Sequence, residues 1–190
     1  MTSYAIDART TPEPLAFPLV AVMTSGASRL EDVTGRLEER YGPVLAQSSV
    51  YLFDDFTSYY EKEFGKGLLK QVVVFSGPRE QALLPGDKHA ACALERELGD
   101  EQNGRRLVNA DPGFMTLSKL VLASTKDHAH RLYLGQGIHG EITLAWKGHS
   151  FERLPWSYPD YVALIPFLNE VRAILHEHLR VSGLDPSRFR

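Results

Sequence analysis

The sequence predicts an α+β protein with a ferredoxin-like β-α-β-β-α-β core, extended by a helix, a C-terminal antiparallel β-hairpin and a final helix. Three observations predict this class. Short apolar runs of strand length alternate with segments of helical periodicity. Gly, Pro and Asn residues separate these segments. Near the C-terminus, two apolar runs flank a tight glycine-containing turn, and a long apolar stripe at helical spacing follows.

The core elements can be read in chain order. Residues 17–24 are an apolar run ending in Ser-Gly, which indicates a buried strand. The next segment repeats apolar residues at helical spacing until Gly42 and Pro43 end it. A short helical insert is predicted at 59–64. The predicted core elements are strand 17–24, helix 30–41, strands 48–53 and 70–76, helix 87–98 and strand 105–109.

The C-terminal half begins with a predicted tight turn at Asp111-Pro112-Gly113 and a helix at 117–124. Residues 130–134 and 138–146 then flank the turn at 135–137, which predicts a hairpin. The loop length predicts three facing pairs, with a fourth across the next turn. These pairs are Leu134 with Ile138, Leu132 with Gly140, Arg131 with Glu141, and Phe151 with Trp146. A final helix is expected at about 162–181.

Composition and charge give the domain organisation and broad class. Residues 1–14 read as a disordered lead-in and 15–190 as a single α+β domain. The formal net charge of −3 gives no global attraction to DNA or to an anionic membrane. A lone cysteine and the absence of a secretory pattern predict a cytoplasmic protein. The sequence leaves the oligomeric state and any cofactor open.

Four segments carry a family resemblance. They are Phe53-Asp54-Asp55-Phe56-Thr57-Ser58-Tyr59-Tyr60-Glu61-Lys62-Glu63, Asn109-Ala110-Asp111-Pro112-Gly113, Thr125-Lys126-Asp127-His128-Ala129-His130-Arg131-Leu132-Tyr133-Leu134-Gly135, and Trp156-Ser157-Tyr158-Pro159-Asp160-Tyr161. Together they resemble a bacterial family, domain of unknown function 4416, over residues 17–180. That family has no established activity, so the resemblance implies no reaction.

The stretch from Asp111 to Tyr161 concentrates groups that bind anions or transfer protons. Residues 105–131 include five basic and two acidic residues, which gives a local surplus of three positive charges. The predicted proton-transfer residues are Asp111, His128, His130 and Glu141. The predicted ligand-binding residues are Lys119, Lys126, Arg131, Trp156, Tyr158 and Asp160.

Several of these residues also have simpler interpretations. His128 and His130 could bind zinc or iron with a distant carboxylate, or one of them could pack in the core or cap a helix. Arg131 and Glu141 could form a plain structural ion pair. Asp160 could cap the last helix. The metal question therefore stays open.

These groups lead to two hypotheses on function. The first is an enzyme or binding protein for a small anionic ligand, phosphorylated or nucleotide-like. The alternative is a non-catalytic interaction module that binds a protein or RNA through the 59–64 insert and the hairpin. The sequence does not predict a GTPase, because the chain has no glycine-rich loop ending in Gly-Lys-Ser/Thr.

Overall fold

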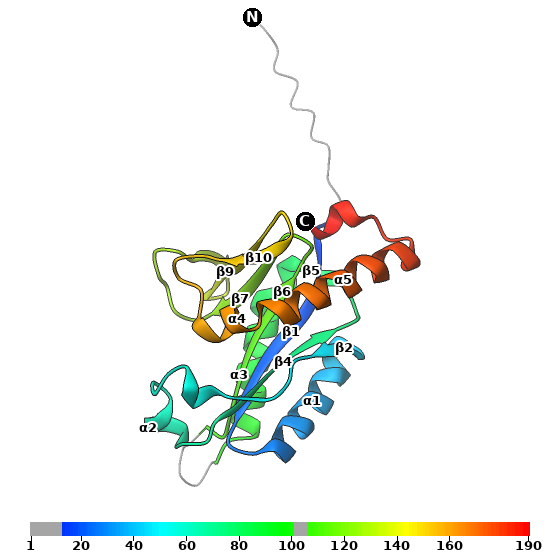
Figure 1. The fold of residues 1–190 in the computed structure, drawn as a ribbon. Helices are drawn as coiled ribbons and strands as arrows, with labels where there is room; N and C mark the ends of the chain where they lie inside the picture. The colour runs from blue at the N-terminus through cyan, green and yellow to red at the C-terminus, as the bar shows by residue number, and fades with distance from the viewer. Residues whose placement is uncertain (1–12, 101–105) are drawn as a thin grey trace, which may run out of the picture.

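The computed structural model describes residues 13–100 and 106–190, which form a large antiparallel sheet with helices on both faces (Figure 1). The described strands are β1 (Leu15–Thr24), β2 (Val44–Gln47), β3 (Tyr51–Leu52), β4 (Leu69–Phe75), β5 (Arg79–Glu80), β6 (Val108–Met115), β7 (Lys119–Ser124), β8 (Leu132–Gly135), β9 (Ile138–Lys147) and β10 (Ser150–Arg153). The described α-helices are α1 (Ala27–Tyr41), α2 (Glu61–Phe64), α3 (Leu84–Glu97), α4 (Pro159–Ala163) and α5 (Ile165–Ser182). The 3-10 turns are η1 (Phe53–Asp55), η2 (Gln81–Leu83) and η3 (Pro186–Phe189).

Strand β1 lies in the middle of the sheet. It pairs antiparallel with β4 on one side and with β6 on the other. The main path of the sheet runs β10-β9-β7-β6-β1-β4-β2, with β3 on β4, β5 on β1 and β8 on β9. The connection through α3 returns the chain as β6 beside β1, whereas β2, which follows α1, pairs with the later strand β4.

The prediction of a ferredoxin-like core with an appended hairpin is wrong. The described strands form one continuous ten-stranded sheet, in which β7 joins β6 to β9. The hairpin is therefore an integral part of the sheet. The broader α+β class agrees with the structure.

The segment at 117–124, predicted as a helix, instead contains strand β7. Leu120 and Leu122 pack on one face of the sheet, and Val121 and Ala123 pack on the other. A strand buried on both faces reads as a continuous apolar run, and periodicity alone does not separate such a run from a buried helix. Burial on both faces explains the error.

The prediction of a tight turn at Asp111-Pro112-Gly113 is also wrong, because these residues lie inside β6 and pair with β1. Pairing of β6 with β7 begins only at Gly113, so the preceding part of β6 is an open edge. Proline is tolerated there because an edge position needs no backbone donor. A Cβ on Gly113 would lie 2.2 Å from the carbonyl oxygen of Val121, so only glycine allows the two strands to approach.

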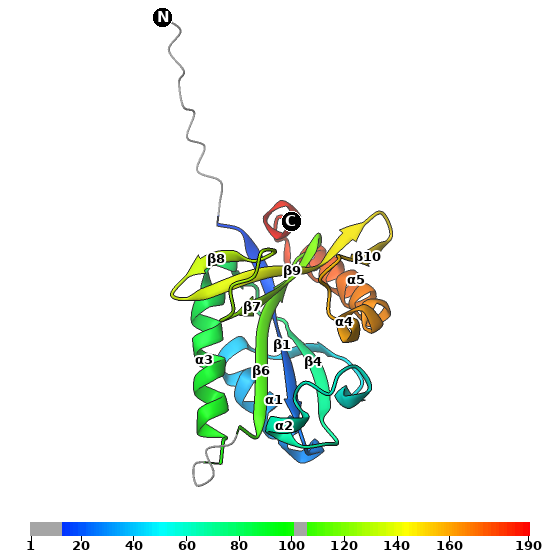
Figure 2. The same cartoon turned by 90° about the vertical axis from the view of Figure 1, so that its left-hand side faces the viewer.

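Helices cover both faces of the sheet (Figure 2). Helices α1 and α3 pack with Val20 and Val22 of β1 in one apolar cluster. Helix α5 and η3 pack with Phe17, Leu19 and Ala21 in a second cluster on the opposite face. Alternate β1 residues therefore face opposite helical layers, as the two-residue period of a strand requires.

The hairpin is confirmed, with one shift in register. Leu132 pairs with Gly140 and Phe151 with Trp146, as predicted. Ile138, however, pairs with Gly135 and not with Leu134, because the ladder is irregular between Tyr133 and Gly135. Gln136 and Gly137 both have positive φ, which matches the twist of a two-residue hairpin turn.

Two predictions fall partly or wholly on residues that the structure does not describe. The lead-in at 1–14 lies outside the described residues, apart from Glu13 and Pro14. The start of the strand predicted at 105–109 also lies outside them, and the described strand begins at Val108. None of the described helices has the length and apolar character of a membrane span.

Candidate functional site

Three of the four segments that carry the family resemblance are joined by polar contacts. The loop before β8 and the start of α4 meet through Arg131 and Tyr158. The segment between β3 and β4 contacts that loop through Tyr59 and Lys126. The start of β6 contributes Asp111, whose charge acts on tyrosines of α4 and of the β3–β4 segment. Residues far apart in sequence thus line one region.

Arg131 belongs to the first of three ion pairs in this region. Its Nε donates to Oε2 of Glu141 at 2.9 Å, and the two side chains are only 5% and 2% exposed. Its terminal nitrogens donate to the Ser124 hydroxyl, the Lys126 carbonyl oxygen and the Tyr158 hydroxyl, at 2.7, 2.9 and 2.8 Å. Arg131 is therefore a buried group that fixes the loop to β9 and α4, with its charge opposed by Glu141.

Three rings form a stack beside this ion pair. His130 stacks on Trp156 at 5.1 Å between ring centroids and on His128 at 5.8 Å, with 14° between the planes in both cases. Nε2 of His130 lies 3.1 Å from Oε2 of Glu141. The indole of Trp156 donates to the Ile142 carbonyl oxygen. Glu141 thus orients an imidazole that is part of a fixed aromatic stack.

A second buried ion pair, Lys70 with Asp160, holds α4 to the sheet. The ammonium of Lys70 lies 2.6 Å from Oδ2 of Asp160, which also accepts from the Tyr51 hydroxyl at 3.0 Å. The same ammonium lies over the rings of Phe53 and Tyr161, 4.5 and 5.0 Å from their centroids. Asp160 is therefore an ion-pair partner, and no side chain caps α4.

A third ion pair, Lys88 with Asp111, closes the open edge of β6. The ammonium of Lys88 donates to Oδ1 of Asp111 at 2.9 Å and to the Ala110 carbonyl oxygen at 3.2 Å. The Ala110 amide donates to Glu95 at 2.8 Å, and Asn109 donates to the other oxygen of Asp111 at 2.7 Å. Side chains of α3 thus take the place of a neighbouring strand at this edge.

The ionisation of these groups follows from their surroundings. Burial works to raise the pKa of Asp111, but the charge and hydrogen bond of Lys88, helped by Lys70 and Asn109, lower it below its usual value. Burial works to lower the pKa of Lys88, and Asp111 outweighs it. Burial raises the pKa of Glu95. Asp111 and Lys88 are thus both charged at neutral pH.

Tyrosines of these segments have raised pKa values. Burial, with smaller contributions from the charges of Asp111 and Tyr158, raises the pKa of Tyr60 to about 12. Burial first, and then the carboxylate of Glu141, raises the pKa of Tyr158. The rings of Tyr158 and Tyr161 lie 6.4 Å apart. These phenols stay protonated at neutral pH and are available as neutral hydrogen-bond donors.

The structure brings together most of the predicted site residues, with one clear exception. One group surrounds the Arg131–Glu141 ion pair and contains His128, His130, Trp156 and Tyr158. Asp111 and Asp160 belong to the ion pairs with Lys88 and Lys70. Lys126 supplies its carbonyl oxygen to Arg131, while its ammonium lies 3.5 Å from the Tyr59 hydroxyl. Lys119 lies at the far end of β7, where its ammonium contacts the carbonyl oxygen of Arg190.

Sequence reasoning missed Lys70, Lys88, Tyr51 and Tyr161. A lysine that opens the apolar run of β4 was a usable signal, because unpaired lysines are rarely buried. Lys88 and Tyr51 gave no such signal, since their partners Asp111 and Asp160 are 23 and 109 residues away.

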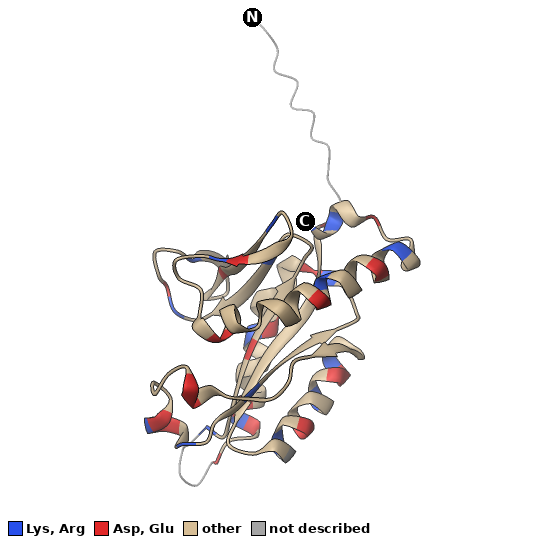
Figure 3. Ribbon diagram, viewed as in Figure 1, with Lys and Arg blue, Asp and Glu red and all other residues tan. Residues whose placement is uncertain are grey.

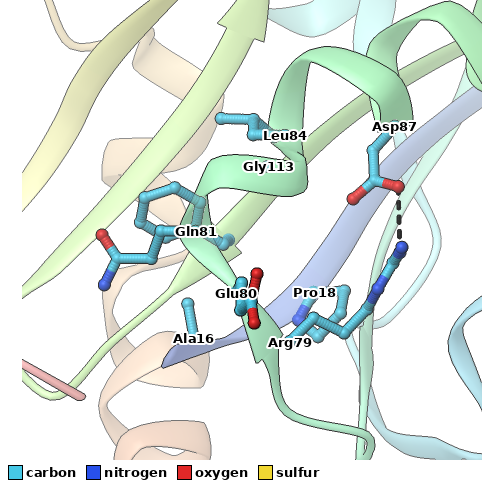
Figure 4. Close-up of a pocket in the computed structure, with 9 residues that line it drawn as sticks. Ala16, Pro18, Arg79, Glu80, Gln81, Leu84, Asp87 and Gly113 are labelled. Carbon is cyan, nitrogen blue, oxygen red and sulfur yellow. Dashed lines mark hydrogen bonds and ion pairs between the residues drawn. The ribbon is translucent and has the colours of Figure 1, made fainter. Parts of the chain in front are cut away.

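Two hollows in the described structure lie outside this cluster. One, between β5 and the start of α3, contains the ion pair of Arg79 and Asp87 (Figure 4). Its volume is about 10 Å³, enough for no more than a single water. The other, about 290 Å³, lies between α1 and α3.

Charge is mixed over the described chain, and both signs occur on α1 and α5 (Figure 3). Among residues 13–100 and 106–190, no group of three or more His, Cys, Asp or Glu side chains is arranged to hold a metal ion. The imidazole of His130 is engaged by Glu141 and by its neighbouring rings. The pair His128 and His130 therefore lacks a third ligand among these residues.

Comparison with known proteins identifies the family. A family model, described as a domain of unknown function (DUF4416), matches residues 14–174 of the 190-residue chain. The chain belongs to the DUF4416 family. The matched region contains all three ion pairs and the stacked rings. Searches of curated proteins and of solved structures found no match to this DUF4416 protein.

Proposed function

We propose that this protein binds a small anionic ligand, phosphorylated or nucleotide-like, at the surface formed by the loop before β8, the start of α4 and the segment between β3 and β4. The supporting observation is the convergence of these separate segments around two buried ion pairs, Arg131 with Glu141 and Lys70 with Asp160. Burying an ion pair seldom adds stability compared with an apolar core. Such an arrangement suits a fixed binding surface better than it suits stability.

Several polar groups on this surface remain available to an anion. Among the described residues, Lys126 makes no ion pair, and its ammonium contacts only Tyr59. His128 is exposed beside it, and its ring belongs to the aromatic stack. The protonated hydroxyls of Tyr60 and Tyr158 add neutral donors. Arg131 acts indirectly in this proposal, because it positions Tyr158 and the backbone of Lys126.

If the protein is an enzyme, His130 is the proposed proton-transfer group and Glu141 its orienting carboxylate. The two side chains are in hydrogen-bond contact, and the His130 side chain is partly exposed while that of Glu141 is buried. This pairing fixes which imidazole nitrogen faces the reacting group. Asp111 is a less direct candidate, since both its oxygens already accept hydrogen bonds.

Calorimetry and thermal shift with inorganic phosphate, phosphate monoesters and nucleotides test the binding proposal. We expect phosphate esters to raise the melting temperature, and Lys126→Ala to weaken binding roughly tenfold, because it removes a charged hydrogen bond. Lys147→Ala is the matched control, since this exposed lysine lies six residues along β9 from Glu141. No stabilisation of the wild type by any anion would contradict the proposal, as would equal binding by Lys126→Ala.

The alternative of an interaction module also has a specific observation in its favour. On the short strand β8, Leu132 and Tyr133 are 73% and 65% exposed. An exposed apolar strand beside one paired neighbour can accept a strand from a partner. Leu132→Lys should then abolish complex formation in size-exclusion chromatography while leaving anion binding unchanged. A chain that elutes as a monomer alone and with candidate partners would contradict this alternative.

A further inference from the structure

The stack of His128, His130 and Trp156 contains two rings that are fixed by hydrogen bonds and a third that is free. The indole of Trp156 donates to the Ile142 carbonyl oxygen at 2.9 Å, and Nε2 of His130 lies 3.1 Å from Oε2 of Glu141. The His128 residue is exposed, and its imidazole makes neither a hydrogen bond nor an ion pair with the described residues. His130 covers one face of the His128 ring. The opposite face is therefore the one on which a further ring can pack.

The geometry of this stack suits a planar aromatic ring. Its two ring pairs have centroids 5.1 and 5.8 Å apart and planes within 14° of each other. Offset-stacked aromatic groups prefer centroid separations of about 4.5–7 Å. A ligand ring on His128 extends the stack by one layer with the same geometry. Because His130 and Trp156 are already fixed, such binding has little side-chain ordering to offset its gain.

An unpaired cation lies close to His128 in the chain. Lys126 precedes His128 by two residues, so their Cα atoms are at most about 7 Å apart. The ammonium of Lys126 lies 5.4 Å from the ring centroid of the exposed Tyr59 and makes no ion pair within the described part of the chain. One ammonium suits one phosphate group. A formal charge of −3 and the lack of a glycine-rich phosphate loop do not suit a triphosphate or a long polyanion.

We infer that the ligand is a mononucleotide, whose base stacks on the open face of the His128 ring while its phosphate contacts the ammonium of Lys126. This inference rests on the proposed function and narrows it from small anions in general to phosphates that carry a planar base. Sugar phosphates have no aromatic ring and leave the stack uncovered. Stacking alone does not select among bases, since every base has a π-face.

The first test compares AMP with ribose 5-phosphate, which carries the same phosphate and sugar without the base. Calorimetry on the wild type should show AMP binding roughly fivefold or more tightly, the effect of stacking one base on an aromatic side chain. His128→Leu should abolish this preference and leave the affinity for ribose 5-phosphate unchanged, because leucine still covers His130 but has no flat π-face. His128→Phe should retain the preference, because it restores a flat ring.

His149→Leu is the matched control. His149 is exposed in the turn between β9 and β10, and its substitution should leave the preference for AMP as it is in the wild type. Circular dichroism melting of the three variants checks that each is folded, which we expect because both histidines lie in exposed segments.

The outcomes separate this inference from the proposed function. Equal binding of AMP and ribose 5-phosphate by the wild type overturns the inference alone, as does a preference for AMP that survives in His128→Leu or is lost in His128→Phe. Tight binding of a short oligoadenylate by a protein that does not bind AMP also overturns it, in favour of single-stranded nucleic acid. Failure of every anion to bind removes the proposed function and this inference with it.

Discussion

Arg131–Glu141 and Arg36–Glu97 are the same chemical pair in two environments. Arg36 and Glu97 join α1 to α3 at the surface, with side chains 42% and 61% exposed. Arg131 and Glu141 lie almost wholly out of solvent, and Arg131 makes three further hydrogen bonds. Water screens the first pair, so removing one partner leaves a solvated charge. Removing one partner of the second leaves a buried charge unopposed.

The contrast between the exposed and the buried ion pair shows where polar groups determine the architecture. Helix α1 contacts the sheet through its apolar stripe, and its ion pair with α3, Arg36 with Glu97, lies at the surface. On the opposite layer, α4 reaches the sheet through the ion pair of Asp160 and Lys70. Such an arrangement specifies one geometry, because Asp160 is held by both Lys70 and Tyr51.

The largest effect is expected for Arg131→Ala. Loss of the guanidinium leaves Glu141 buried without its opposing charge, which should lower the free energy of unfolding by about 3–5 kcal/mol. Arg36→Ala should show no measurable change. Urea denaturation of both variants measures the contrast, and equal effects would remove it. Replacing Arg131 and Glu141 together with Met and Leu should recover much of the stability, because the unpaired charge is gone.

Asp111→Asn should have the next largest effect, about 2–3 kcal/mol at neutral pH, because it removes a charged hydrogen-bond partner of Lys88. The pKa of Asp111 is lower in the folded protein, so its contribution is present above its usual value of 3.8 and is lost as the pH falls through the folded pKa. Wild type and variant should therefore converge in acid. A difference in stability that does not shrink as the pH falls contradicts this assignment.

Glu95 should show the opposite trend at the same strand edge. Its pKa is raised above 4.5, so its stabilising contribution is full below that value and declines as the pH rises through the folded pKa. The stability of the wild type relative to that of Glu95→Gln should therefore be greater near pH 4 than at pH 7. Denaturation at several pH values measures the trend, and parallel pH profiles for Glu95→Gln and Asp111→Asn would contradict it.

The smallest effects on stability are expected for two tyrosines that contact the Lys70–Asp160 ion pair. Tyr51→Phe removes a hydrogen bond to a carboxylate and should cost about 1.5–2 kcal/mol. Tyr161→Phe removes a hydroxyl without a partner among the described residues, so stability should stay the same or rise slightly. Thermal melts without added ligand measure both changes. A loss in Tyr161→Phe as large as in Tyr51→Phe would show that its hydroxyl is paired, for example with an ordered water.

Part of the candidate site could be predicted from local sequence. The hairpin turn fixes Leu132 opposite Gly140 within a few residues, and this register brings Arg131 to Glu141. The stack of His128, His130 and Trp156 follows from the same hairpin only once α4 is placed. The ion pairs of Lys70 with Asp160 and of Lys88 with Asp111 each join a strand to a helix, and they depend on tertiary packing that no local pattern encodes.

The sequence by itself determined the elements whose signals are local. The apolar stripes of α1 and α5 and the turns at 136–137 and 148–149 follow from helical spacing and from glycines with positive φ. Only the tertiary structure decided that 119–124 is a strand and that Asp111-Pro112-Gly113 continues β6. The physical reason is that both segments acquire their conformation from neighbours. Burial on two faces makes β7 a strand, and the close approach of β7 at Gly113, with the open edge at Pro112, keeps β6 extended.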